Sequence, residues 1–487
     1  MNGEAPSPNA WPVGVDPPGY RPGTFSPGIV HLGLGAFHRA HQAVYTDDAL
    51  AAAGGDWRIV AVSLRSAATA DALTRQGNWY SLIVRDEAGA KARVVGSIAD
   101  ALSAPRDPEA VLRRLADPAI RIVTLTVTEK AYGLNRETGG LDPAHEAVAH
   151  DLRHPDRPVG VIGYLVEALR RRREAGTPPF TVLCCDNFPE NGKLVRRLVS
   201  GFASEVDGEL AAWIESEVAF PSSMVDRITP APTPETLALA EDLLGRPDAA
   251  AVEAEPFSQW VIEDNFPTGR PAWEAGGALF VADVAPYEKM KLRMLNGAHS
   301  LIAYAGFLAG QACVRDAMAD TGLAWRVNRH IRAAARTLDP VPGIDLGNYG
   351  DDLMRRFANP FIAHETYQIA MDGTEKLPQR LLQPAMDALA RGEDADVFAL
   401  AVAFWMRYAL GRTDAGETYE LRDPRQEQLA AATGGDADPG ALAARLAAAA
   451  GVFPTALSQD TAWMGRVADH LARMLENGVT ESLRAFA

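Results

Sequence analysis

The chain has 487 residues, 47% hydrophobic and 23% charged, a globular composition rather than a disordered or fibrous one. Its formal net charge of -16 argues against a nucleic acid or an anionic membrane as partner, since the longest basic run, at 170–174, is expected only to end a helix. Three cysteines, two of them adjacent, and no signal-like or membrane-spanning apolar stretch lead us to expect a cytoplasmic protein without a disulfide framework.

The hydrophobic pattern changes along the chain and predicts two domains. Residues 1–27 are rich in Pro and Gly and are expected to form an extended lead-in. Residues 28–285 carry short apolar runs between helical patterns, which is typical of an α/β domain whose mostly parallel sheet is covered on both faces. The predicted strands lie at 28–35, 57–65, 80–84, 120–129 and 180–187. Residues 286–487 have helical spacing with few strand signals, so we expect a mainly α-helical second domain.

Two glycines stand where the first predicted strand turns into a helix at 36–53. Gly33 and Gly35 begin a G-x-G-x-x-G-like pattern in which His38 replaces the third glycine. Glycines at this junction let the backbone approach a pyrophosphate, towards which the helix N-terminus directs N–H groups. The pattern therefore favours a dinucleotide site, and a purely structural tight turn is the alternative.

The end of the second predicted strand lacks the acidic residue that usually binds the adenosine ribose. Ser63, Arg65 and Ser66 stand there instead. Arg65 could accept a 2′-phosphate or stack on adenine, so the residues leave NAD and NADP both open.

The histidine spacings do not indicate a metal site. His38 and His41 are three residues apart on one helical face, but neither a cysteine nor a carboxylate supports them at a ligand spacing. We therefore expect no metal.

A lysine, an asparagine and a histidine interrupt an apolar helical run at 284–310. At about 100° per residue, Lys291, Asn296 and His299 fall within an arc of about 140°. Buried lysine has a lowered pKa and can act as a general base, an asparagine amide can hold an oxyanion, and histidine can orient a hydroxyl. Oxidation of a secondary alcohol needs these three functions. Three satisfied structural polar residues are the alternative.

The same motif resembles the active-site motif of the polyol-specific long-chain dehydrogenases, the mannitol dehydrogenase family. Four further segments resemble that family in the same order, at 33–42, 126–133, 185–192 and 220–230. Runs at 259–274, 291–310 and 368–380 resemble the fructuronate reductases of its hexuronate branch more than the mannitol dehydrogenases.

The resemblance implies a Rossmann-type N-terminal domain, a helical C-terminal domain and metal-independent hydride transfer with NAD. It implies Lys291 as general acid/base, with Asn187 and Asn296 holding the reacting oxygen and His299 positioning it. Asp226 matches a substrate-binding position, and Glu288 is the candidate for proton exchange with solvent. The implied cofactor-binding residues are Gly33, Gly35, Phe37, His38, Arg65, Thr128, Glu129 and Asp186.

The predicted activity is the interconversion of D-fructuronate and D-mannonate. A uronate carries a carboxylate that a polyol lacks, so its site needs a cation, and Lys376 and Arg380 are the candidates. Alternatives are a mannitol or other polyol 2-dehydrogenase, a tagaturonate reductase, and a catalytically silent sugar-acid sensor. We expect a small-molecule substrate and, by default, a monomer, although an oligomer stays open.

Overall fold

The computed structural model describes residues 11–86, 89–135, 138–361, 363–435 and 438–484, so the first ten residues of the predicted lead-in lie outside the described part. The chain divides into two compact units, Met1–Ala285 and Pro286–Ala487. In the described part, every helix is too short or too polar to cross a membrane.

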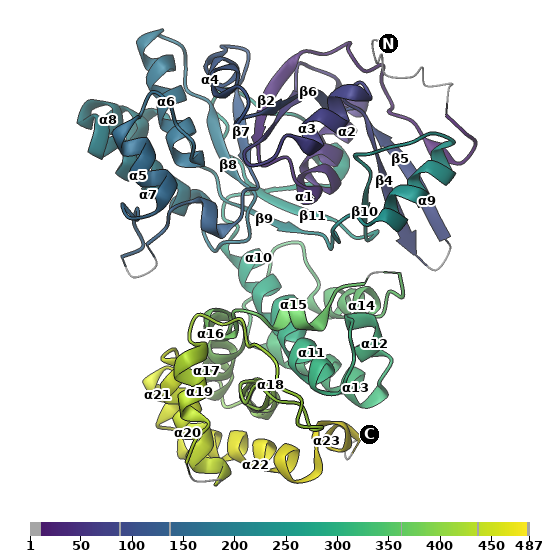
Figure 1. Cartoon of the computed structure of the whole chain (residues 1–487), viewed down its shortest axis with the longest axis vertical. Coiled ribbons are helices and arrows are strands. Elements are labelled where there is room, and N and C mark those ends of the chain that lie inside the picture. Colours follow the sequence, from purple (N-terminus) through teal and green to yellow (C-terminus); the bar gives the residue numbers. More distant parts are fainter. Residues whose placement is uncertain (1–10, 87–88, 136–137, 362, 436–437, 485–487) are drawn as a thin grey trace. The chain divides into compact units, whose positions relative to one another are not determined.

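The first unit is built around a five-stranded parallel sheet (Figure 1). Its spatial order is β6 (Ile98–Ser103), β3 (Arg58–Ser63), β2 (Pro27–Leu32), β7 (Ile122–Leu125) and β8 (Thr181–Cys184). The first strand of this sheet in chain order, β2, therefore lies at its centre, and the chain continues outward first on one side and then on the other. This is the Rossmann-type order, whose ligand site lies outside the carboxyl ends of the strands at the switch between β2 and β7.

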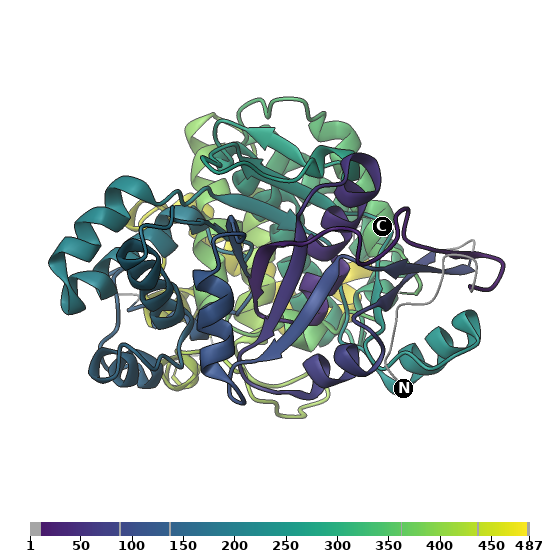
Figure 2. The ribbon, with the colours of Figure 1, turned by 90° about the horizontal axis from the view of Figure 1, so that it is seen from above.

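Alternate residues of these strands enter two separate hydrophobic cores. Figure 2 shows the strands of this sheet from above. Val30 and Leu32 of β2 pack towards α4, α6 and α7, whereas Ile29 packs on the opposite face with α2 and α3. The prediction of a sheet covered on both faces is confirmed. The helices of this unit are α1 (Ala36–Ala40), α2 (Gln42–Ala53), α3 (Ala68–Arg75), α4 (Pro108–Ala116), α5 (Glu146–Arg153), α6 (Val161–Glu174), α7 (Asn191–Val206), α8 (Gly208–Glu217) and α9 (Pro234–Leu244).

Two smaller sheets complete the first unit and correct one sequence expectation. The predicted strand at 80–84 forms as β4 (Tyr80–Asp86), but it does not belong to the parallel sheet. It pairs antiparallel with β5 (Gly89–Val95) and parallel with β10 (Val252–Ala254), and β1 (Val15–Asp16) lies beyond β5. The third sheet has the order β12 (Leu279–Val281), β11 (Gln259–Glu263) and β9 (Ser223–Asp226).

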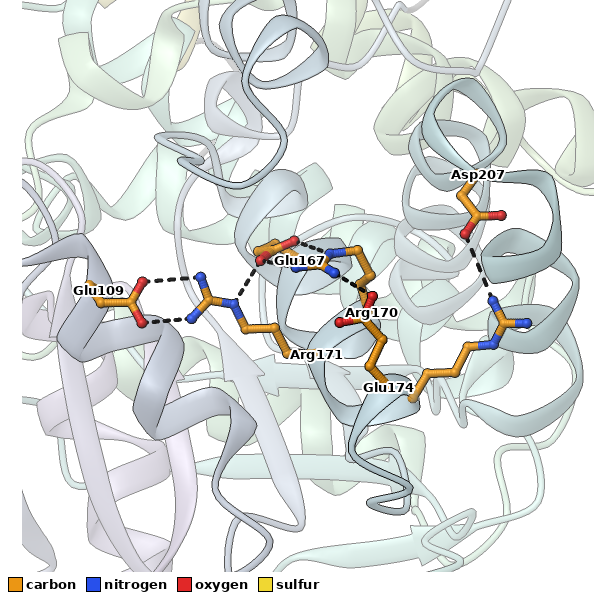
Figure 3. Close-up of polar contacts among 7 residues, drawn as sticks. Glu109, Glu167, Arg170, Arg171, Glu174 and Asp207 are labelled. Atoms are coloured by element: carbon orange, nitrogen blue, oxygen red, sulfur yellow. Dashed lines mark hydrogen bonds and ion pairs between the residues drawn. The ribbon is translucent and has the colours of Figure 1, made fainter.

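The arginine run at the end of α6 is neutralised within its own unit (Figure 3). Arg170 and Arg171 bind the carboxylate of Glu167 at 2.6 and 2.7 Å, and Arg171 also reaches Glu109 of α4 at 2.7 Å. Arg172 is buried and donates to the backbone carbonyls of Leu115, Asp117, Ile120 and Pro178. The run therefore ends a helix, as predicted, and ties it to its neighbours.

The second unit is helical. Helix α11 (Gly297–Leu308) is almost wholly buried and packs against α13 (Thr321–Arg336), α15 (Thr366–Ala370) and α18 (Asp396–Tyr408). The other α-helices are α10 (Ala285–Met290), α12 (Val314–Met318), α14 (Leu346–Phe357), α16 (Gly373–Leu377), α17 (Gln383–Ala390), α19 (Gln426–Ala432), α20 (Pro439–Ala450), α21 (Thr455–Ser458), α22 (Thr461–Asn477) and α23 (Val479–Arg484).

Two π-helical segments interrupt this arrangement and pack against each other. They are η4 (Lys291–Asn296), between α10 and α11, and η5 (Pro378–Leu382), between α16 and α17. Gly297 directly follows η4 and lies against η5. A Cβ atom on Gly297 would lie 2.9 Å from the carbonyl oxygen of Arg380 and 2.9 Å from Nε2 of His330. π-Helical turns are rare and concentrate at functional sites. The absent side chain of Gly297 allows the two segments to meet.

Buried histidines in both units should make stability depend on pH. Burial lowers the pKa of His31 to about 3 and that of His330 to about 4, whereas the unfolded chain titrates at about 6.5. Between those values only the unfolded state binds the proton. Each histidine therefore contributes stability that is fully present above pH 6.5 and is lost, at about 1.4 kcal/mol per pH unit, as the pH falls towards its folded pKa.

We expect the midpoint of urea unfolding to fall as the pH is lowered from 7 to 5. In His330→Leu, the midpoint of the second unit should fall less steeply with pH than in the wild type. The exposed His154→Leu serves as the control and should keep the wild-type slope. An unchanged slope in His330→Leu would contradict the assignment.

Candidate active site

The two glycines of the turn after β2 differ in backbone conformation and in the space around them. Gly33 follows β2 with φ +113°, and a Cβ atom on it would overlap the carbonyl oxygen of Thr126. Gly35 has φ -96° and is exposed, and the nearest atom to a Cβ on it would be the carbonyl oxygen of Gly33 at 3.8 Å. The fold therefore requires glycine at 33, whereas at 35 a side chain would occupy only the open space above the turn.

Two stacked histidines lie beneath this turn. His31 bonds to Oγ1 of Thr124 at 2.7 Å, to Oγ1 of Thr126 at 2.8 Å and to the carbonyl oxygen of Gly33 at 3.0 Å. Its ring stacks on that of His38 at 3.4 Å, and both side chains are fully buried. His38 thus packs against the support of the turn, and its predicted contact with a cofactor stays a prediction.

The helix predicted after the turn at 36–53 is interrupted. Helix α1 ends at Ala40, and α2 begins at Gln42, because His41 takes φ -127° and ψ -90°. Nε2 of His41 binds the carbonyl oxygen of Gln259 at 2.9 Å, which ties the break to β11. Phe37 is half-buried and stacks on His41 at 5.1 Å.

The chain after β7 is strained and is held by a carboxylate from the end of β8. Thr128 has φ 73°, a conformation that costs a non-glycine residue about 1–3 kcal/mol and clusters at functional sites. Asp186 accepts hydrogen bonds from the backbone N–H groups of Val127 at 2.9 Å and Thr128 at 3.3 Å, and from the Tyr132 hydroxyl at 2.6 Å. Burial raises the pKa of Asp186, although these hydrogen bonds oppose the shift. Thr128 and Glu129 are exposed at this edge.

Arg65 lies beside a hollow at the same edge of the sheet. The hollow has a volume of about 450 Å³ and is lined by residues after β3 and β7 and around α5 and α6, among them Arg65, Lys130, His145 and Glu146. Arg65 is exposed. Its position at the carboxyl end of β3 is where the adenosine half of a dinucleotide binds in this fold.

Two further predicted site residues of the first unit lie at or just after the carboxyl ends of strands. Asn187 is exposed directly after Cys185 and Asp186, at the carboxyl end of β8. Asp226 is buried as the last residue of β9 in the third sheet, opposite Gln259 of β11.

In the second unit the helix carrying the Lys-Asn-His motif is not a regular α-helix. Lys291 and Asn296 are the first and last residues of the π-helix η4, whereas the predicted arc assumed α-helical spacing throughout. In a π-helix, residues five apart are joined by a backbone hydrogen bond, so Lys291 and Asn296 lie one turn apart on one face. His299 follows in the first turn of α11. We call Lys291, Asn296 and His299 the polar cluster.

Two members of the polar cluster keep buried polar atoms without hydrogen-bond partners among the described residues. They are Nδ2 of Asn296 and Nε2 of His299, and each residue is 6% exposed. Arg293 of the same π-helix is buried too, but it donates to the carbonyl and Oγ1 of Thr337, both at 2.9 Å, and to Asp387 at 2.5 Å. An unpaired buried group costs about 1–3 kcal/mol, so this contrast supports the prediction that Asn296 and His299, unlike Arg293, bind a ligand.

The surroundings of His299 are positively charged. Burial lowers its pKa well below the ordinary value, and nearby positive charges lower it further, those of His364, Arg356, Arg380 and Lys291. A neutral imidazole keeps one donor and one acceptor nitrogen at working pH.

The two basic residues predicted to bind a substrate carboxylate also donate hydrogen bonds to the backbone. Arg380 donates to the carbonyl oxygen of Asn296 at 3.4 Å and to Oγ of Ser300 at 3.3 Å. The ammonium of Lys376 donates to the carbonyl oxygens of Ile369, at 3.2 Å, and Met371. Glu288 is buried in α10, one turn before Lys291.

The sequence analysis missed one residue of this region. His364, from the segment between α14 and α15, places its ring 5.5 Å from that of His299. Only tertiary contact could reveal it, because it is 65 residues away in the chain and belongs to no catalytic spacing. Within the described part of the chain, no three His, Cys, Asp or Glu side chains gather as metal ligands.

The chain is similar to known proteins over most of its length. A family model for the mannitol dehydrogenase Rossmann domain matches residues 27–275, and one for the mannitol dehydrogenase C-terminal domain matches residues 283–475. D-mannonate oxidoreductase of Escherichia coli strain K12 is 43% identical over 468 residues, covering 94% of this chain and 95% of the relative. Mannitol 2-dehydrogenase of Cereibacter sphaeroides is 42% identical over 419 residues, covering 85% and 87%. Identity therefore does not separate the two substrates.

A solved relative matches both units. The ternary complex of Pseudomonas fluorescens mannitol 2-dehydrogenase with NAD and D-mannitol has a TM-score of 0.86 at 37% identity, covering 99% of this chain and 98% of that one.

The two glycines of the turn should respond differently to alanine. Gly35→Ala introduces no clash with the protein, so we expect an unchanged unfolding midpoint together with at least about tenfold weaker NADH binding, because the Cβ enters the space of the pyrophosphate. Gly33→Ala should lower the midpoint. NADH fluorescence titration and thermal unfolding measure both effects, with Gly201→Ala, where a Cβ meets nothing within 4 Å, as the control. Full NADH affinity in Gly35→Ala would exclude this turn as the cofactor site.

Proposed function

The chain belongs to the mannitol dehydrogenase family and is an oxidoreductase acting on CH–OH groups, and from this premise we propose that it interconverts D-fructuronate and D-mannonate with NAD. The observation that carries the choice of an acidic substrate is the charge around His299. The charged groups that act most strongly on its imidazole are all basic side chains. A carboxylate on the substrate would neutralise such surroundings, and an uncharged polyol would not.

The first unit fits a dinucleotide on three observations. Gly35 leaves the space above the turn after β2 open, the strained Thr128 borders the neighbouring strand end, and the hollow beside Arg65 lies where adenosine would bind. Bound NAD supplies the hydride acceptor for alcohol oxidation, and NADH the hydride donor for ketone reduction. We propose NAD rather than NADP, following the family resemblance, and Arg65 as a contact of the adenosine end.

The polar cluster would then perform the proton chemistry. The ammonium of Lys291 donates a proton to the carbonyl oxygen as the ketone is reduced, and the neutral amine takes it back in the reverse direction. The unpaired amide of Asn296 donates a hydrogen bond to the same oxygen as negative charge develops on it. His299, neutral because it is buried, offers its unpaired Nε2 to orient the substrate hydroxyl.

A second candidate function is supported by the relatives. Mannitol 2-dehydrogenases share the same two domains and nearly the same identity. A polyol would use Lys291, Asn296 and His299 in the same roles, but it would bring no negative charge to the cations around His299.

The proposal predicts a substrate preference. With NADH, we expect D-fructuronate to be reduced with a kcat/KM about 10- to 150-fold above that for D-fructose, because one charge-assisted hydrogen bond contributes about 1.5–3 kcal/mol. Initial rates of NADH oxidation with D-fructuronate, D-tagaturonate and D-fructose, repeated with NADPH, measure this. Preference for fructose would indicate a polyol dehydrogenase, and faster rates with NADPH would refute the proposed cofactor.

Lys291 should be required for chemistry and not for cofactor binding. We expect Lys291→Ala to lower kcat by at least about 10²-fold, the ordinary contribution of a general acid/base, with unchanged NADH affinity. Lys289→Ala is the matched control, since Lys289 lies two residues earlier on the same helical run and only approaches Asp339 at 3.8 Å. Substantial turnover in Lys291→Ala would assign the proton transfer to another group.

A further inference from the structure

The backbone around His364 is fixed, although the residue stands outside any helix or strand. Its carbonyl oxygen accepts a hydrogen bond from the N–H of Val314 at 2.9 Å, and the N–H of Thr366 donates to the carbonyl oxygen of Ala312 at 2.9 Å. Cys313 and Glu365 form an isolated antiparallel bridge between these two contacts. The hydroxyl of Thr366 donates to the carbonyl oxygen of Gln311 at 2.7 Å. The backbone of His364 is therefore fixed through its own carbonyl group and through the two residues that follow it.

The ring of His364 is directed towards the polar cluster. It stands at 89° to the ring of His299, in an edge-to-face arrangement with the centroids 5.5 Å apart. Its Nδ1 is buried and has no hydrogen-bond partner among the residues that the structure describes. The side chain as a whole is only partly buried. A fixed backbone and an unpaired ring nitrogen beside His299 are the arrangement of a ligand-binding histidine.

The charges near His364 are positive. Burial is the main cause of its lowered pKa, and the charge of Lys376 is the second. His299, the ring it contacts, is in turn surrounded by Lys291, Arg356 and Arg380. An arriving anion would be attracted by these positive charges.

We propose that His364 binds the carboxylate of the substrate through Nδ1, and so selects acidic substrates over uncharged ones. The inference rests on the proposed reduction of a keto acid and names a residue that no active-site spacing in the sequence contains. Lys376 then adds its charge to the same carboxylate while its ammonium remains tied to the carbonyls of α15 and the following turn. Arg380 donates instead to the carbonyl oxygen of Asn296 and to the hydroxyl of Ser300.

The chemistry of the imidazole explains the selectivity. An N–H group that donates to a carboxylate forms a charge-assisted hydrogen bond, about twice as strong as one to a hydroxyl. The terminal hydroxymethyl group of a ketose would occupy the same position without that gain. Loss of His364 should therefore weaken binding of the acid and leave binding of the uncharged sugar nearly unchanged.

The test compares two substitutions and two classes of ligand. His364→Leu removes the donor, whereas His364→Asn keeps an amide nitrogen close to the position of Nδ1. With NADH and D-fructuronate we expect KM to rise about 10- to 100-fold in His364→Leu while kcat changes by less than about threefold. His364→Asn should restore most of the affinity. His154→Leu, at an exposed position of the first unit, is the control.

A binding measurement separates this inference from the proposed function. Dissociation constants for D-mannonate and D-mannitol follow from the ligand-induced rise of the unfolding midpoint, without turnover. We expect His364→Leu to weaken D-mannonate binding at least tenfold more than D-mannitol binding. Equal changes for both ligands, or no change for either, would overturn the role of His364 even if the wild type reduces fructuronate. Absence of fructuronate turnover in the wild type, with selective loss of mannonate binding in His364→Leu, would refute the reductase and retain the carboxylate site.

Discussion

The two π-helical segments of the second unit pack closely at Gly297, and the positions of the proposed catalytic groups Lys291 and Asn296 depend on this packing. An α-helical turn at 291–296 would place Lys291 and Asn296 about 140° apart around the axis, whereas the π-helical turn brings them onto one face. The widened turn is held by η5, whose Arg380 donates to the carbonyl oxygen of Asn296. A methyl group on Gly297 would meet the backbone of Arg380 and Nε2 of His330. A rare helix geometry is thus stabilised by tertiary contact and positions two of the proposed catalytic groups.

In the first unit, too, contacts between segments that are distant in the chain hold the backbone in an unusual conformation. The backbone of Gly33 lies against Thr126 so closely that only glycine fits, and the carboxylate of Asp186 holds Thr128 in a strained conformation. Both contacts join neighbouring strands at their carboxyl ends. The energy of the buried sheet, with Val30 and Ile29 entering opposite cores, maintains strained turns that would not persist alone.

Charge is distributed unevenly over the protein. The net charge is -16, and the conspicuous arginine run of α6 is neutralised by Glu167, Glu109 and backbone carbonyls. Around His299 the strongest charged influences are all positive. Basic side chains around the proposed reacting centre of an otherwise acidic protein favour an anionic substrate, because they attract its negative charge.

The sequence by itself determined the class of each domain and the chemistry of the motifs. Alternating apolar runs identified β2, β3, β7 and β8, since a strand buried on both faces has no polar side, and the Lys-Asn-His spacing led to the family. Tertiary structure alone decided the rest. The strand at 80–84 joined another sheet, because strand partners depend on long-range pairing that local pattern does not encode. The π-helix at Lys291 and the placement of His364 beside His299 arose from packing between segments 65 to 84 residues apart in the chain, which local propensity cannot specify.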